Sequence, residues 1–171
     1  FRRVLFRSFE TTRNAFSGGV LALLQNPAQM ALLRNDPKLL RLAAEEFVRW
    51  SNPVLSLMRV ATADTTLGGK SVRAGDRLLL WFPSANRDED VFDRPYEFDV
   101  TRHPNLHLGF GGGPHFCLGG PLAKLEIRLA MEVLLERYEG IEITGPVEWV
   151  QSTFVGGLKR LPVALKPKAT H

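Results

Sequence analysis

Apolar residues recur every three or four positions in several stretches of this chain, which is the periodicity of amphipathic helices. The pattern predicts helices over residues 10–25, 28–34, 38–50 and 118–138. A residue that precedes proline is disfavoured in the helical conformation, so prolines are expected to end the first three of them. These prolines are Pro27, Pro37 and Pro53.

Between the third and fourth helices the pattern changes to that of strands. Residues 56–66 and 70–82 predict strands joined at Gly68-Gly69, with a second turn at Ala74-Gly75-Asp76, and residues 141–166 predict further short strands. Residues 83–109 are rich in Pro, Asp, Asn and Arg and have little periodicity; such long irregular segments are usually functional. The sequence therefore predicts a mainly α fold with small β-sheets, in the α+β class.

Composition narrows the class of protein. The chain has 171 residues, 44% apolar and 23% charged, which is ordinary for a globular domain. A single cysteine excludes an internal disulfide framework and multi-cysteine zinc or iron–sulfur sites, and it fits a reducing cytoplasm. No apolar run reaches the length of a membrane span, and no signal peptide is visible. We expect a cytoplasmic protein.

The first residues differ in character from the rest. Residues 1–9 resemble a non-native leader translated from adapter sequence, and residues 10–171 form the expected domain. The formal net charge is +4, and three of these charges come from Arg2, Arg3 and Arg7. Nucleic-acid binding is therefore not expected, unless these residues form a natural basic arm.

The only cysteine lies in a glycine-rich segment, residues 110–119, just before the last predicted helix. A helix N-terminus has partial positive charge and free N–H groups, which favour a thiolate at Cys117. The glycines allow the backbone to approach something large and flat. The residues alone leave three alternatives: a ligand thiolate, a cysteine nucleophile acting with His115, or a buried structural thiol.

The spacing Phe-x-x-Gly-x-x-x-Cys-x-Gly resembles the signature of cytochrome P450 haem-thiolate monooxygenases, and two further residues match its bacterial form. In that family the cysteine is the axial ligand of the haem iron, and its thiolate favours O–O cleavage. The histidine two positions earlier typically holds a haem propionate. The resemblance implies haem b, with Cys117 as metal ligand and with Phe110, Gly111, Gly113, His115 and Gly119 at the cofactor.

A second motif lies on the helix of residues 38–50. Glu46 and Arg49 are three residues apart, so they share one helix face; alone they could be a surface ion pair worth about 0.5 kcal/mol or less. The pair also matches the Glu-x-x-Arg motif of the family, and Arg102 falls where the family has a third member. The resemblance implies a buried, structural triad that fixes the segment before the cysteine loop.

Three other positions have two interpretations each. Arg59 lies in an apolar strand, where it either extends to solvent or pairs with a haem propionate, as the resemblance favours. His107 is either a propionate contact or a packed core histidine. Glu10 and Thr11 either cap the first helix or lie mid-helix, where the resemblance implies proton delivery to bound O2.

The resemblance covers residues 10–166 and only the C-terminal part of the family fold. It implies that the parent protein inserts one atom of O2 into a C–H bond, with electrons from NAD(P)H through a ferredoxin reductase and a ferredoxin. Segments such as 81–89 and 156–163 resemble actinobacterial enzymes that hydroxylate sterol side chains and branched lipids, which implies a lipophilic substrate. We expect the isolated chain not to hold haem stably, and a non-catalytic remnant or interaction domain is the alternative. The expected substrate-lining residues are Val54, Leu55, Phe154 and Val155.

Overall fold

Four long helices form the body of the chain. The computed structural model describes residues 2–169, with side chains described from Glu10 onward. The helices predicted from the sequence are confirmed as α1 (Arg2–Gln25), α2 (Pro27–Asn35), α3 (Leu40–Ser51) and α5 (Gly120–Arg137), and a 3-10 turn, η1 (Pro37–Leu39), precedes α3.

Helix α1 begins well before residue 10, because no glycine or proline interrupts residues 2–10. Glu10, Thr11 and Thr12 therefore lie in the middle of α1, and the alternative that they cap its N-terminus is wrong. The prediction that residues 1–9 are a non-native leader remains a prediction. Residue 1 and the side chains of residues 2–9 lie outside the described part of the chain, as do residues 170–171.

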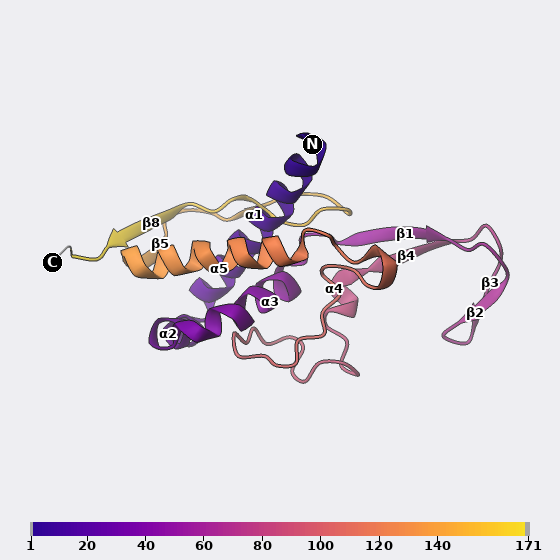
Figure 1. Cartoon of the computed structure of the whole chain (residues 1–171), viewed down its shortest axis with the longest axis horizontal. Helices are drawn as coiled ribbons and strands as arrows, with labels where there is room; N and C mark the ends of the chain where they lie inside the picture. The colour runs from indigo at the N-terminus through magenta and orange to yellow at the C-terminus, as the bar shows by residue number, and fades with distance from the viewer. Residues whose placement is uncertain (1, 170–171) are drawn as a thin grey trace.

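The core lies where α1, α3 and α5 pack together behind the face shown in Figure 1. Leu23, Phe47 and Ile127, one from each helix, are at most 1% exposed. Gly19 lets α1 approach α3 closely, since a Cβ built on it would lie 2.0 Å from the Phe47 ring. This packing holds the middle of α1 over the loop that precedes α5.

The strands form two-stranded antiparallel sheets. Strand β1 (Ser56–Val60) pairs with β4 (Arg77–Trp81), and β2 (Thr65–Leu67) pairs with β3 (Lys70–Val72). Together they form the arm that extends to the right in Figure 1. The predicted turns at Gly68-Gly69 and at residues 74–76 are both confirmed. The predicted strand of residues 56–66 is interrupted at residues 61–64, because Ala61 and Asp64 bond to the turn of residues 73–76.

The remaining elements are short. Helix α4 (Phe82–Ala85) and the 3-10 turn η2 (Gly113–His115) lie in the otherwise irregular segment between β4 and α5. Strand β5 (Tyr138–Ile143) pairs with β8 (Val163–Pro167), and β6 (Glu148–Trp149) pairs with β7 (Leu158–Arg160). The predicted α+β class is confirmed. No helix within the described residues is both long and apolar enough to cross a membrane.

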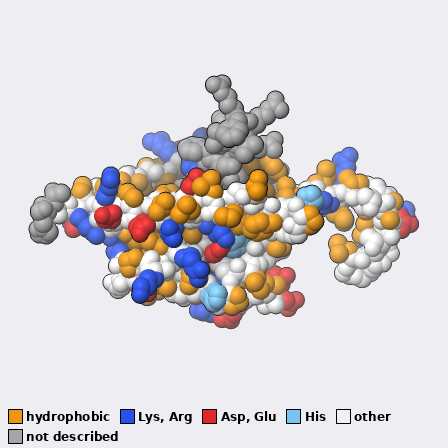
Figure 2. All heavy atoms as spheres, viewed as in Figure 1, with side chains coloured by type: hydrophobic (Ala, Val, Ile, Leu, Met, Phe, Trp, Pro, Cys, Tyr) orange, Lys and Arg blue, Asp and Glu red, His pale blue; other side chains and the backbone are white. Residues whose placement is uncertain are grey.

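Helix α5 has two apolar faces. The inner one, with Ile127, Met131 and Leu135, belongs to the core. A stripe of four apolar residues spaced three or four positions apart lies on the other face, and hydrophobic side chains gather over α5 in Figure 2. Its residues are 42–55% exposed: Leu122, Leu125, Leu129 and Val133.

Candidate cofactor site and its supporting network

One cavity of about 260 Å³ brings together residues from distant parts of the sequence. It lies between the middle of α1, the residues after α3, and the cysteine loop, and it is lined mainly by apolar groups. Among the described residues of its lining there is no Asp or Glu, so no carboxylate there could orient His115 toward Cys117 as a hydrolase requires. Of the predicted site residues, the lining contains Thr11, Val54, Phe110, Gly111, His115, Cys117, Gly119 and Phe154.

The cysteine loop is shaped by its own backbone bonds. The Cys117 amide donates to the Phe110 carbonyl at 2.8 Å, which closes the loop at its two ends. Gly111 and Gly113 adopt φ values of +74° and +57°, a region that side chains rarely occupy. Cys117 is exposed and lies three residues before the first residue of α5. The loop therefore presents the sulfur beside a helix N-terminus, as expected.

The residues present fit a planar cofactor with one axial thiolate. Cys117 supplies a single soft donor, and the described residues contain no cluster of three His, Cys, Asp or Glu side chains that could bind a bare metal ion. No atoms lie within 4 Å of where a Cβ at Gly112 or Gly113 would be, so this part of the loop has an open face. Phe110 provides an apolar wall, and Thr11 lines the same cavity from α1.

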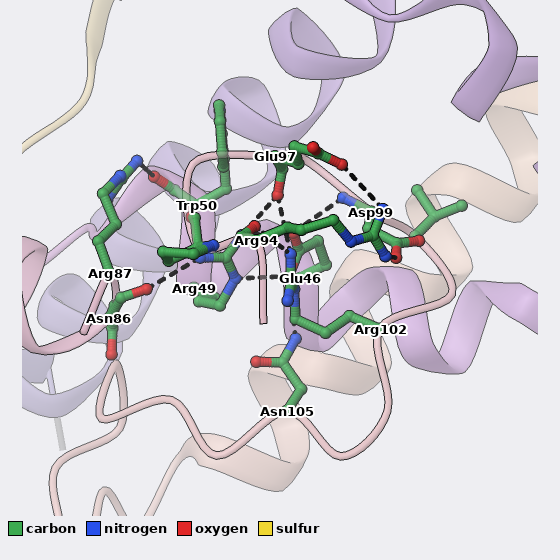
Figure 3. Close-up of polar contacts among 12 residues, drawn as sticks. Glu46, Arg49, Trp50, Asn86, Arg87, Arg94, Glu97, Asp99, Arg102 and Asn105 are labelled. Carbon is green, nitrogen blue, oxygen red and sulfur yellow. Dashed lines mark hydrogen bonds and ion pairs between the residues drawn. The ribbon is translucent and has the colours of Figure 1, made fainter. Parts of the chain in front are cut away.

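Glu46 is the centre of a buried polar network between α3 and the irregular segment (Figure 3). Its carboxylate accepts two hydrogen bonds from the Arg49 guanidinium, both at 2.7 Å, and both side chains are fully buried. It also accepts from the Asp99 amide and the Asn105 side chain, each at 3.0 Å. A buried, ionised carboxylate is stable only when its oxygens accept hydrogen bonds and its charge is paired in this way.

Arg102 joins the network from the irregular segment. Its Nε lies 3.3 Å from Glu46 Oε2, an ion-pair contact whose angle is too poor for a hydrogen bond. Its other nitrogens donate to the carbonyls of Asp93, Arg94 and Glu97. The structure thus brings together the three predicted residues of the triad, and Arg102 also fixes the backbone of residues 93–97 through these hydrogen bonds.

Asn86 connects the network to the start of the cysteine loop, a role that the sequence did not reveal. Its side chain, fully buried, donates to Asn52 Oδ1 and accepts from the Leu108 amide, each at 2.7 Å. Its carbonyl accepts from Arg49 at 2.9 Å. Its only sequence signal was its place in the segment of residues 81–89, which resembles actinobacterial enzymes.

A second cluster, which sequence reasoning also missed, holds the loop from the other side. Glu45 accepts from Lys124 at 2.9 Å and lies 3.1 Å from His107 Nε2. The Gly109 amide donates to His107 Nδ1 at 3.1 Å, so His107 carries its proton on Nε2 and donates it to Glu45. His107 is thus the packed histidine of the two alternatives, with its side chain only 3% exposed.

The interactions within this cluster favour the ionised form of Glu45. Burial is the largest influence and opposes ionisation, but hydrogen bonds from His107 and Lys124, together with the positive charge of Lys124, hold the pKa of Glu45 below its usual value. Glu45 therefore ties α3 to both ends of the cysteine-loop region, since Lys124 lies in the first turns of α5.

Several predicted residues lie outside the cavity lining. Glu10 is exposed on α1, and Arg59 is exposed on β1, where it donates to the Met58 carbonyl. Val155 forms a β-bridge with Val54 and thereby places the two predicted substrate segments side by side. Leu55 lines a different pocket, on the side of α1 that carries Asn14.

Comparison with known proteins identifies the family. The sequence model described as Cytochrome P450 matches residues 25–153. The chain belongs to the cytochrome P450 family, a class of haem proteins that use O2.

Individual relatives agree with this assignment. Cytochrome P450-terp of a Pseudomonas species is 49% identical over 90% of this chain, and the steroid C26-monooxygenase of Mycobacterium tuberculosis is 45% identical over 96%. The structure of cytochrome P450-153 from Novosphingobium aromaticivorans superimposes with a TM-score of 0.89 and 42% identity over 92% of the chain. The chain spans only 36%, 45% and 40% of these three proteins, respectively.

Proposed function

We propose that the protein to which this chain belongs is a haem-thiolate monooxygenase, with Cys117 as the axial ligand. The observation that carries the proposal is that Cys117, His115, Phe110 and Thr11 line one apolar cavity, although Thr11 is about a hundred residues from the others. Haem, when bound there, supplies the activation of O2 by which one oxygen atom enters a C–H bond. The residues of this chain bind and orient the haem and the substrate, and they control the delivery of protons.

The polar residues divide into two groups. His115 in the loop and Arg59 on β1 are proposed to bind the haem propionates, since both are exposed and both carry N–H donors that can pair with carboxylates. Thr11 in α1 is proposed to hold a water or proton at its hydroxyl, with the exposed Glu10 beside it as the group that takes up protons from solvent and passes them inward. The Glu46 and Glu45 clusters keep the loop rigid so that these groups retain their positions.

The substrate is proposed to be lipophilic. Val54 and Phe154 line the cavity together with Leu57 and Phe82, so an aliphatic group would be surrounded by apolar atoms near Thr11. One relative is a steroid C26-monooxygenase, which supports a sterol side chain or a branched lipid as the substrate class. Leu55, in another pocket, is not needed for this proposal.

Electrons are proposed to come from NAD(P)H through a ferredoxin reductase and a ferredoxin. A cytoplasmic location stays a prediction.

We propose that the 171-residue chain alone does not bind haem stably and is inactive, because the exposed face of α5 favours self-association over assembly of the site. The alternative for the isolated chain is a non-catalytic remnant.

A graft tests the proposed function. The N-terminal part of the M. tuberculosis steroid C26-monooxygenase is joined to residues 10–171 of this chain, which gives a protein of family length. With NADH, a bacterial ferredoxin and its reductase, the graft should hydroxylate a steroid that has an aliphatic side chain. Thr11→Ala should divert most of the consumed O2 to peroxide. A folded, haem-loaded graft that forms no hydroxylated product would contradict the proposal for this substrate class.

A further inference from the structure

Asn14 is a buried cross-link between α1 and the C-terminal part of the chain. It is 2% exposed, and its Nδ2 donates to the Gly156 carbonyl at 3.1 Å, across 142 residues of sequence. A buried hydrogen bond of this kind fixes the relative position of the two segments that it joins.

The fit between the two segments is close. A Cβ built on Gly157 would lie 2.4 Å from Asn14 Cγ, so only glycine leaves room for the asparagine there. Gly157 is not among the glycines with positive φ, so its backbone conformation does not require glycine. Glycine is needed there because a side chain would collide with Asn14. Asn14 therefore contacts the backbone of residues 156–157 directly.

The cross-linked turn carries a wall of the cavity. The Leu55 amide donates to the Phe154 carbonyl at 2.9 Å, and the Gly156 amide donates to the Pro53 carbonyl at 3.1 Å. Phe154 lines the cavity, and so does Thr11, which lies three residues before Asn14 on α1. The same turn of α1 thus presents Thr11 to the cavity and holds the segment of Phe154.

Stability alone does not account for an asparagine here. Its Oδ1 is buried and has no hydrogen-bond partner among the described residues, which opposes folding. Only the donor half of the amide is used, so neither aspartate nor an apolar residue of the same size would make the contact with Gly156.

We propose that Asn14 is a positioning residue that sets the separation between Thr11 and Phe154, and thereby the room for an apolar substrate group beside the reacting oxygen. This inference rests on the proposed function. It predicts that loss of the Asn14 donor loosens the turn of residues 153–157 and weakens binding of ligands that fill the cavity, without weakening access to the iron.

The first experiment needs no haem. Hydrogen–deuterium exchange is measured at the Leu55 and Gly156 amides of the 171-residue chain and of Asn14→Ala, with Ser17→Ala as the control because the Ser17 hydroxyl donates to the Asn14 backbone carbonyl within α1 and does not involve the Asn14 side chain. Asn14→Ala should raise exchange at both amides by about tenfold, and Ser17→Ala should not. Gly157→Ala should have a similar effect because the added methyl displaces Asn14, and the double variant Asn14→Ala/Gly157→Ala should match Asn14→Ala without a further increase, which keeps the test decisive if one variant fails to fold.

The second experiment uses the haem-loaded graft and two probes, imidazole and 4-phenylimidazole. Asn14→Ala should leave the dissociation constant of imidazole unchanged and raise that of 4-phenylimidazole by about tenfold, because only the phenyl ring needs the Phe154 wall. Equal changes for both probes, or unchanged exchange at Leu55 and Gly156, would overturn the proposal. Failure of the graft to bind haem would instead count against the proposed function, while the exchange measurement would still decide whether Asn14 holds the turn.

Discussion

Glu46 and Arg49, one helical turn apart on α3, form a bidentate ion pair from which water is fully excluded. Arg49 also donates to the carbonyls of Asn86, Pro95 and Glu97, so the pair connects α3 to three points of the irregular segment. The pair thereby organises a stretch of backbone that has almost no secondary structure of its own. The cysteine loop is the continuation of that stretch.

Removing one partner of this pair should destabilise the chain strongly. Glu46→Gln leaves Arg49 buried without a compensating charge, and we expect the free energy of unfolding to fall by about 3–5 kcal/mol. Glu97→Gln is a matched control, because Glu97 pairs with Arg94 at the same three-residue spacing but at the surface. It should change the free energy by about 0.5 kcal/mol or less. Urea unfolding measures both, and equal effects would contradict the structural role of Glu46.

The start of the cysteine loop should tolerate no side chain at Gly109. A Cβ there would lie 2.5 Å from Val48 Cγ1, so Gly109→Ala should cost about 1–3 kcal/mol of stability, and Val48→Ala should relieve part of that loss. Gly112→Ala is the control: its surroundings are open and its φ of −159° suits any residue. Thermal unfolding of the four variants measures these effects. If Gly109→Ala/Val48→Ala is no more stable than Gly109→Ala, the contact with Val48 is not the cause of the loss.

The sequence predicted the helices and the cysteine loop because their signals are local. Proline stops, glycine positions and the spacing around Cys117 all lie within short windows of the chain. The Glu46, Arg49 and Arg102 cluster required the family resemblance, because Arg102 reaches Glu46 across more than fifty residues.

Long-range contacts made by ordinary residues were missed for the same reason. Asn86, Glu45 and Asn14 act through partners 22 to 142 residues away, and no periodicity marks such pairs. The stripe that contains Leu125 and Leu129 has the same limit. Its spacing indicates a helix, but the spacing does not show which of the two apolar faces of that helix is buried in the core.

Acid should weaken the Glu45 cluster. Because the pKa of Glu45 is lowered in the folded chain, its stabilisation is fully present above the pKa of the unfolded chain and is lost as the pH falls through the lower, folded value. The stability difference between the wild-type chain and Glu45→Gln should therefore be constant near neutrality, at about 1 kcal/mol or less, and shrink below the ordinary glutamate range. Urea unfolding across this pH range measures it; a difference that grows on acidification would reverse the sign and contradict the argument.

The outer face of α5 should drive self-association of the 171-residue chain. Leu125→Gln with Leu129→Gln should reduce association in sedimentation experiments without lowering stability, because both side chains are more than 40% exposed. Ile127→Gln, on the same helix but 1% exposed, should instead unfold the chain. Unchanged association in the double variant would mean that another surface is responsible.

The ferrous–CO spectrum of the graft tests most directly whether Cys117 is a haem ligand. The account predicts a thiolate-type Soret band for the graft, its loss in Cys117→Ala with the protein still folded by circular dichroism, and no stable band for the 171-residue chain alone. A thiolate-type band that survives Cys117→Ala, or a folded, haem-loaded graft that never shows one, would contradict the assignment of Cys117.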